Sequence, residues 1–200
     1  VNGSDAIVTA GGVSGNNTNL VFRTAPSGNE TERLRIDSDG RLLLGHNTDI
    51  GLGFRSQIVG TDGMTSSHCQ MRFSDSVSGP QIALGKSRNG TPGSNTIVQD
   101  DDVLGTLQWR GDDGTDYLSQ AAAIQCKVDG TPGSNDMPGR LLFNTTPDGS
   151  ASATTRMTIQ SNGEVALNSH STPTDALANL HVQNSTFRVS NRSDGADTTY

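Results

Sequence analysis

The chain has 200 residues, of which 21 are acidic and 14 basic, so its net charge is −7. Hydrophobic residues supply 31% and aromatic residues 4% of the sequence, below the share of a typical soluble domain. An acidic chain without a cluster of Lys and Arg has no electrostatic footprint for nucleic acid or an anionic membrane, and no run approaches the roughly 20 apolar residues of a membrane span.

The first predicted strands lie between Leu20 and Leu44. Apolar residues alternate with polar ones there, and three pairs share a face: Leu20 with Phe22, Leu34 with Ile36, and Leu42 with Leu44. Period-two alternation indicates half-buried antiparallel strands. Asp39-Gly40 stands where the chain must reverse, and both residues of such a pair can take a positive φ angle. We therefore expect a hairpin there.

The middle of the chain carries a short repeat. NGTPGSN at Asn89–Asn95 recurs as DGTPGSN at Asp129–Asn135, and each copy follows an alternating run. The first run is Ile82 with Leu84, and the second consists of Ala122, Ile124, Cys126 and Val128. Another strand, ending at the turn Gly111–Gly114, is expected from an apolar face made of Val103, Gly105, Leu107 and Trp109.

The first group of strands recurs further along the chain. Leu141–Gly149 matches Leu20–Gly28, and Arg156–Leu167 matches Arg33–Leu44. The linker between the two blocks is two residues longer in the second copy, which marks a surface loop between strands. The corresponding apolar pairs are Leu141/Phe143, Met157/Ile159 and Val165/Leu167, with Asn162-Gly163 at the reversal.

A last hairpin is predicted from Leu180–Val182 and Phe187–Val189, whereas Asp175–Leu180 forms one helical turn at most. Gly and Pro recur too often for a longer helix. The sequence therefore predicts an all-β fold. We divide it into a first repeat unit (1–60), a central segment (61–135), a second repeat unit (136–170) and a C-terminal hairpin segment (171–200).

So few apolar residues cannot fill the interior of one compact domain of this length. A disordered chain is disfavoured because the apolar residues come in alternating clusters. Repeats of a unit too thin to bury itself favour an extended architecture in which neighbours supply the missing contacts. We expect an elongated, intertwined homotrimer of short antiparallel strands and hairpins, built as a triple β-helix or β-prism or as packed β-sandwiches.

Catalysis by paired carboxylates has six candidates: Asp100, Asp101, Asp102, Asp112, Asp113 and Asp116. Glycan hydrolysis needs one carboxyl group whose pKa is raised by an apolar pocket. These residues have polar, turn-like neighbours, so solvated loops are expected instead. No catalytic residue is predicted.

Metal and thiol chemistry find little support either. Asp37–Gly40 resembles the start of a calcium loop but lacks the third acidic ligand and the later Glu, so a hairpin turn is favoured. The histidines, which show no metal-ligand spacing, are His46, His68, His170 and His181. Cys69 and Cys126 form no CxxC pair, and free thiols are favoured over an intrachain disulfide. No metal or cofactor is predicted.

Two aromatic residues bear on recognition of a ligand. Trp109 alternates with Leu107, so we expect it in the core. Tyr117 stands beside a turn and is the weak candidate for a contact with a sugar ring.

Several of these motifs resemble tail-fibre proteins of tailed bacteriophages and prophages. The stretches that carry the resemblance are Glu32–Ile36 with Asp39-Gly40 and Leu44-Gly45, Val103–Gly111 with Asp113–Thr115, Asp136–Gly149 with Arg156–Ile159, and Leu180–Val182 with Phe187–Val189. In that family such units lie upstream of an endosialidase-type intramolecular chaperone domain. Two positions depart from the pattern: Thr155 stands where an acidic residue usually precedes Arg, and Asn168 where Gly is usual.

The resemblance implies a homotrimeric fibre segment on the outside of a virion, with a structural and not an enzymatic role. Its implied partners are further copies of itself, other tail or baseplate proteins, and a glycan or protein receptor on the host surface. Two alternatives stay open. One is a surface adhesin or capsid-decoration protein, and the other is a glycan depolymerase whose site is shared between chains.

Overall fold

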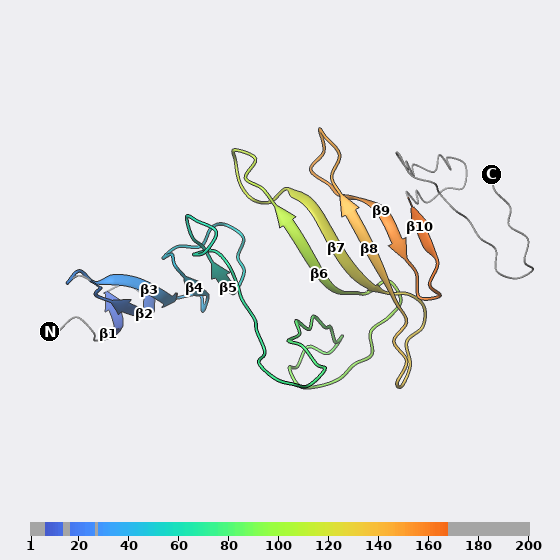
Figure 1. Ribbon diagram of the computed structural model, residues 1–200, viewed down its shortest axis with the longest axis horizontal. Coiled ribbons are helices and arrows are strands. Elements are labelled where there is room, and N and C mark those ends of the chain that lie inside the picture. Colours follow the sequence, from blue (N-terminus) through green and yellow to red (C-terminus); the bar gives the residue numbers. More distant parts are fainter. Residues whose placement is uncertain (1–6, 14–16, 27, 168–200) are drawn as a thin grey trace, which may run out of the picture. The chain divides into compact units, whose positions relative to one another are not determined.

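The structure is a computed structural model that describes residues 7–13, 17–26 and 28–167. In these residues the chain forms ten β-strands and no helix (Figure 1). The strands belong to two five-stranded sheets. The predicted all-β class with short antiparallel strands and hairpins is confirmed. Within the same residues no helix is long and apolar enough to cross a membrane.

The first sheet has the order β1-β2-β3-β4-β5. Its strands are β1 (Ile7–Val13), β2 (Asn17–Thr24), β3 (Thr31–Ile36), β4 (Leu42–Leu44) and β5 (Ser56–Ile58). The first four strands pair antiparallel, as successive hairpins do. β5 instead returns parallel to β4, after a loop long enough to make that crossover.

The second sheet is antiparallel throughout and has the order β10-β9-β8-β7-β6. Its strands are β6 (Val103–Arg110), β7 (Gln120–Val128), β8 (Gly139–Thr145), β9 (Thr154–Ile159) and β10 (Val165–Leu167). Each strand is joined to the next along the chain, so the sheet is a meander with β6 and β10 at its edges.

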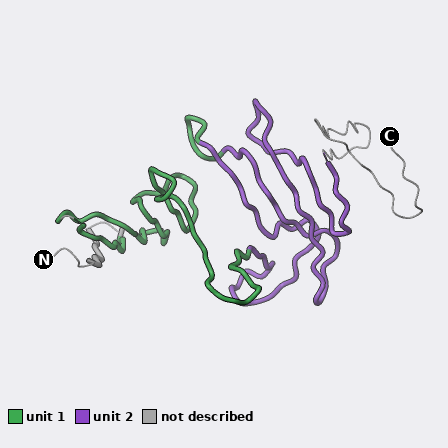
Figure 2. The backbone as a smooth tube through the Cα atoms, viewed as in Figure 1, with its two compact units in different colours: residues 1–83, 112–118 green, residues 84–111, 119–200 purple. Residues whose placement is uncertain are grey.

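The chain divides into two compact units, drawn in different colours in Figure 2. The first comprises residues 1–83 and 112–118, and the second comprises residues 84–111 and 119–200. β6 and β7 therefore join the same sheet as the second repeat unit. The four-segment division proposed from the sequence stays a prediction.

The two copies of the long motif pair their strands in the same register. Leu20 lies opposite Ile36 as Leu141 lies opposite Ile159. In both copies the register slips directly after the phenylalanine of the first strand, at Phe22 and at Phe143. The linkers that differ in length are the loops β2–β3 and β8–β9, as predicted from the sequence.

The hairpins predicted at Asp39-Gly40 and Asn162-Gly163 form, but not with the predicted turn. Only the glycines have positive φ, 75° at Gly40 and 87° at Gly163; Asp39 and Asn162 do not. The first turn is closed by hydrogen bonds from Asp37 N to Arg41 O (3.0 Å) and from Gly40 N to Asp37 O (2.9 Å). The loop is thus longer than a two-residue type I′ turn, and such loops need only one left-handed residue.

The middle of the chain departs further from expectation. Ile82 and Leu84 are not part of a strand, and their exposed fractions are 71% and 53%. Val103 does not continue the face of Gly105, because the register slips between these two residues. The hairpin predicted at 180–189 and the helical turn at 175–180 lie outside the described residues.

The two NGTPGSN-like copies fold into different turns. In the first, Ser94 N donates to Thr91 O (3.1 Å) and Gly93 has a φ of 84°. In the second, Gly133 and Asp136 exchange two backbone hydrogen bonds (3.0 and 3.2 Å), and Asn135 has a φ of 58°. Asparagine tolerates this left-handed conformation better than most residues.

Candidate functional site: the apolar face of the second sheet

The second sheet carries one continuous apolar face, which we call the β6–β10 face. Its residues are Gly105, Leu107 and Trp109 of β6, Ala122, Ile124 and Cys126 of β7, Leu141 and Phe143 of β8, Met157 and Ile159 of β9, and Val165 and Leu167 of β10. Side chains at alternate positions of a strand share a face, and residues opposite each other on neighbouring strands share it too.

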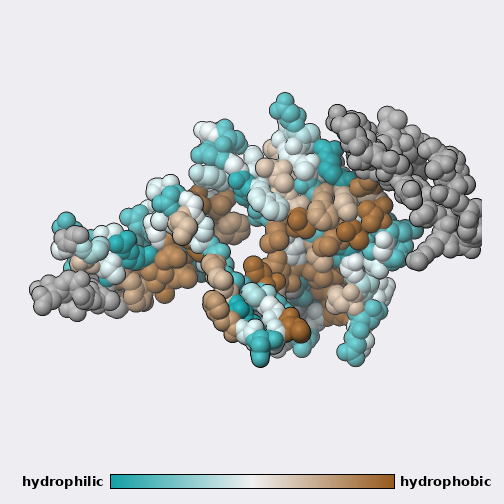
Figure 3. All heavy atoms as spheres, viewed as in Figure 1, coloured by the Kyte–Doolittle hydropathy of each residue, from teal (hydrophilic) through white to brown (hydrophobic). Residues whose placement is uncertain are grey.

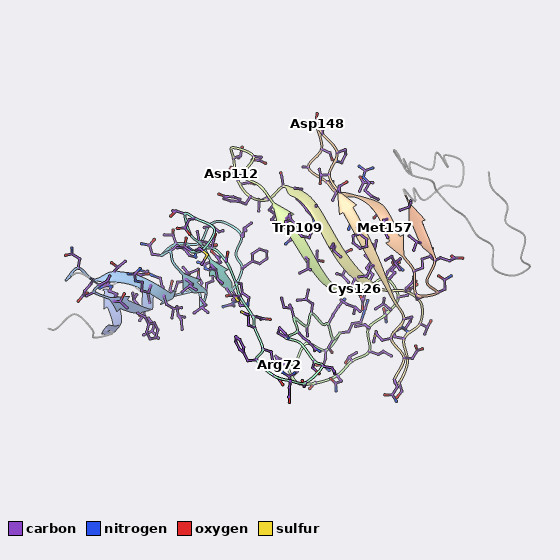
Figure 4. All side chains as sticks on the ribbon, viewed as in Figure 1. Arg72, Trp109, Asp112, Cys126, Asp148 and Met157 are labelled. Carbon is purple, nitrogen blue, oxygen red and sulfur yellow. The ribbon has the colours of Figure 1, made fainter. Side chains whose placement is uncertain are left out.

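Two rows of this face run across all five strands. One row is Gly105, Cys126, Leu141, Ile159 and Val165, and the other is Leu107, Ile124, Phe143, Met157 and Leu167. Figure 4 labels Trp109, Cys126 and Met157 on their strands, and hydrophobic residues gather over this sheet in Figure 3. The register thus aligns apolar residues that the sequence shows only as separate pairs.

Within one chain the β6–β10 face is poorly covered. Leu107 is 52% exposed, Trp109 54% and Val165 54%. The expectation that Trp109 lies in the core is therefore wrong for the single chain, although its predicted face is right. A contiguous apolar surface left exposed on a protein marks an interaction site.

The opposite face of the sheet is more polar. Gln125 Nε2 donates to Thr106 Oγ1 across β7 and β6 (3.2 Å). Thr155 Oγ1 donates to Asn144 Oδ1 across β9 and β8 (2.8 Å). The sheet is therefore two-sided, with side-chain hydrogen bonds on one face and hydrocarbon on the other.

Leu84 covers one part of the β6–β10 face. Its side chain lies over Gly105, so close that a Cβ atom added to Gly105 would be 2.5 Å from Leu84 Cβ. Beside it is an apolar hollow of about 210 Å³, lined by Leu84, Leu104, Gly105, Leu107, Ile124, Cys126 and Leu141. The glycine at 105 therefore makes room for a side chain from outside the sheet.

The segment after Leu84 is held by a buried carboxylate, which corrects the expectation that Asp102 lies in a solvated loop. Its side chain is 8% exposed and accepts hydrogen bonds from Arg88 Nε (2.6 Å), Lys86 Nζ (2.7 Å) and Gln99 N (2.9 Å). These bonds, first that of Arg88 and then that of Lys86, hold the pKa of the Asp102 carboxyl well below its usual value.

A second ionic cluster surrounds Arg140. Its guanidinium donates to Asp129 Oδ1 (2.8 Å) and pairs with Asp101. Asp129 also accepts hydrogen bonds from Ser161 N (2.8 Å) and Ser161 Oγ. Ser161 N first, and then Arg140, lower the pKa of the Asp129 carboxyl to about 2. This cluster ties the loop before β6 and the β7–β8 loop to the turn before β10.

The other predicted site residues lie in the loop from β6 to β7. The carboxylates of Asp112, Asp113 and Asp116 accept hydrogen bonds from the backbone N–H groups of Gly114 (2.8 Å), Thr115 (2.9 Å) and Leu118 (2.7 Å). They act as turn acceptors, as their setting in the sequence suggested. Tyr117 lies in the same loop and is 38% exposed.

No group of three or more His, Cys, Asp or Glu residues suited to a metal ion occurs in the described residues. At Asp37–Gly40, where a calcium loop was considered, the Asp37 carboxylate accepts hydrogen bonds from Asp39 N (3.0 Å) and Arg41 N (2.9 Å) and closes the hairpin turn. Cys69 and Cys126 are both free thiols, as favoured from the sequence. His170 and His181 lie outside the described residues.

The fold and this face define an all-β protein built from antiparallel hairpin sheets, one of which leaves an apolar surface open. The chain is similar to the carboxy-terminal domain of the bacteriophage T5 L-shaped tail fibre, with a TM-score of 0.67, 16% identity, and coverage of 94% of this chain and 78% of that chain. A structure of that domain with its intramolecular chaperone domain gives a TM-score of 0.62, 15% identity, and coverage of 95% and 56%.

Identities this low establish a likeness of fold alone. No protein-family model matches the chain, and no curated protein matches it either.

Proposed function

We propose that the chain is a structural segment of a phage tail fibre that assembles as a homotrimer on the outside of the virion. The open β6–β10 face is the observation that carries this proposal. The likeness to a tail-fibre domain supports the class, and the ionic and turn roles of the six candidate carboxylates favour a structural over a catalytic role.

A three-fold assembly gives the β6–β10 face the cover that one chain lacks. In a cyclic trimer the same surface of each copy is buried in the same way. The apolar face is therefore covered in all three copies by the same contacts. Burial of apolar surface contributes roughly 25 cal/mol per Å². The exposed apolar side chains of β6, β8 and β10 and the partly exposed ones of β7 and β9 therefore supply a driving force for association.

The solution mass of the purified chain tests the proposal. We expect sedimentation equilibrium at micromolar concentration to give three times the chain mass of 20.9 kDa. We also expect the trimer to survive unheated detergent and to dissociate on heating. A monomer at this concentration would contradict the trimer and with it the fibre assignment.

Attachment to the host surface is the second part of the proposed function. Tyr117 is the candidate contact for a host glycan, because aromatic rings stack on sugar rings and this residue lies in an exposed loop. Other tail or baseplate proteins and the host receptor are the further proposed partners. In this proposal the chain contributes both to the length of the fibre and to its attachment to the host surface.

Replacing Tyr117 tests the contact. Tyr117→Ala should weaken binding of the purified protein to host cells by roughly tenfold, the effect of losing one aromatic contact. Tyr117→Phe keeps the ring and should retain most of the binding. Equal binding by the wild-type protein and Tyr117→Ala would remove Tyr117 as the contact.

A further inference from the structure

Residues 68–83, which we call the arm, are exposed along their whole length. The arm contains no strand, and its one hydrogen bond joins Ser76 N to Ser74 Oγ (3.2 Å). Arg72, labelled in Figure 4, lies in its first half. A segment with so few hydrogen bonds of its own keeps backbone and side-chain groups that another surface can bind.

The arm is nonetheless rich in large apolar side chains. Met71 is 71% exposed, Phe73 90%, Val77 105% and Ile82 71%. Met71 and Phe73 alternate with Arg72 and Ser74, the pattern of an extended segment with one apolar side. Four such side chains left in water form an interaction surface, not a linker.

The arm runs directly into Leu84, the residue that lies over Gly105 of the edge strand β6. Leu84 shows that the β6–β10 face accepts an aliphatic side chain from outside the sheet. The hollow beside Leu84 is lined in part by Cys126 and Leu141 and has room for further apolar side chains. The face and the arm are therefore complementary: one is an apolar surface without cover, and the other an apolar strip without a partner.

We propose that in the assembly the arm of one copy lies across the β6–β10 face of a second copy. This inference rests on the proposed trimer and specifies which segment is exchanged between subunits. An arm of this length spans at most roughly 50 Å at about 3.3 Å per residue, and its bend at residues 75–77 shortens that reach. A five-stranded sheet is only about 20 Å wide at a strand spacing of roughly 4.8 Å, so the arm can cross a neighbouring face.

The two native cysteines test the exchange. Cys69 lies in the arm and is exposed, and Cys126 lies on the β6–β10 face. A short bismaleimide should link Cys69 of one copy to Cys126 of the next and give a covalent trimer on a denaturing gel. Links between equivalent residues stop at dimers, because each thiol reacts once. Cys69→Ser and Cys126→Ser should each abolish the trimer band, and peptide mass spectrometry should identify the Cys69–Cys126 link.

A pair of arm variants provides an independent readout. Phe73→Ser should lower the temperature at which the trimer dissociates in detergent by several degrees, whereas its neighbour Arg72→Ser should leave that temperature unchanged.

The proposed trimer and the proposed arm exchange are contradicted by different results. A monomeric wild-type protein overturns the trimer. A trimer in which Phe73→Ser behaves like Arg72→Ser, or whose Cys69–Cys126 links stay within one chain, overturns the arm exchange alone.

Discussion

Leu107→Asp is expected to convert the assembled protein to monomers without unfolding the chain. Leu107 is at the centre of β6 on the apolar face and is 52% exposed in the single chain. The monomer therefore loses little of its own packing. In an assembly that covers the face, the new carboxylate is buried without a partner, and a buried unpaired charge costs several kcal/mol.

In the proposed trimer this energetic penalty applies to every copy of the chain. Each 1.4 kcal/mol corresponds to about a tenfold change in affinity, so association should weaken by several orders of magnitude. Sedimentation at micromolar concentration should then report the mass of one chain. The far-ultraviolet circular dichroism spectrum should keep its β-sheet form.

The neighbouring residue supplies the matched control. Gln108 lies on the opposite, polar face and is exposed, so Gln108→Asp adds the same carboxylate without touching the apolar face. It should remain trimeric. Trp109, the one tryptophan of the chain, adds a spectroscopic readout, since its emission should shift to longer wavelength in Leu107→Asp but not in Gln108→Asp. A trimeric Leu107→Asp would show that the β6–β10 face is not the assembly surface.

The strands could be predicted from the sequence because their signal is local. Leu141 and Phe143 alternate with polar neighbours, and that alternation fixes both the strand and the face. The hairpin at Asn162-Gly163 follows from the turn preference of its glycine. In the two long repeat copies, where each residue's role depends on its nearest neighbours in the chain, the predicted strands and their apolar faces agree with the structure.

Features set by distant contacts could not be predicted. The run Asp100–Asp102 looks like a solvated turn, yet Asp102 is buried because Lys86 and Arg88 reach it from more than a dozen residues away. Lys86 and Arg88 are two residues apart in the sequence and so lie on the same side of their segment. This spacing was the available sequence signal for a shared anionic partner. Nothing in the local sequence assigns them a partner.

The NGTPGSN-like copies make the same point with nearly identical residues. The Asn89 side chain bonds to Thr91 N and Thr96 Oγ1 within its own loop. Asp129, its counterpart, bonds to Ser161 and Arg140 from other strands and turns. The first heptapeptide is therefore stabilised by hydrogen bonds within its own loop. The second is stabilised by hydrogen bonds to other strands and turns of the sheet. Tertiary contacts override local turn preference here.

The β6–β10 face, the candidate site, could be predicted from local sequence patterns only in part. The pairs Leu141/Phe143 and Met157/Ile159 predict which side of each strand is apolar, but the alignment of these pairs into two rows requires the strand order. The strand order in turn depends on β6 and β7 pairing with the second repeat unit. No sequence motif predicts that pairing. In the proposed trimer the two rows are covered by other copies of the chain, and the local sequence pattern does not reveal such contacts.

Asp102→Asn should lower the melting temperature of the protein by roughly 5 to 10 °C at pH 7, the effect of breaking a buried ion pair in a chain of this size. The variant leaves Lys86 and Arg88 close together without their carboxylate and releases the segment that carries Leu84. Differential scanning calorimetry measures the change. Asp148→Asn makes the same chemical change in the exposed β8–β9 loop and should leave the melting temperature within about 1 °C of wild type.

The pH dependence of the same pair separates charge from packing. The pKa of the Asp102 carboxyl is lowered in the folded state, whereas in the unfolded chain it has its ordinary value of about 4. The unfolded chain therefore takes up the proton first as the pH falls. The stability that this carboxylate contributes is fully present above about pH 4 and is lost progressively below it. The difference in melting temperature between wild type and Asp102→Asn should accordingly shrink from pH 7 to pH 2, and a constant difference would assign the effect to packing and not to charge.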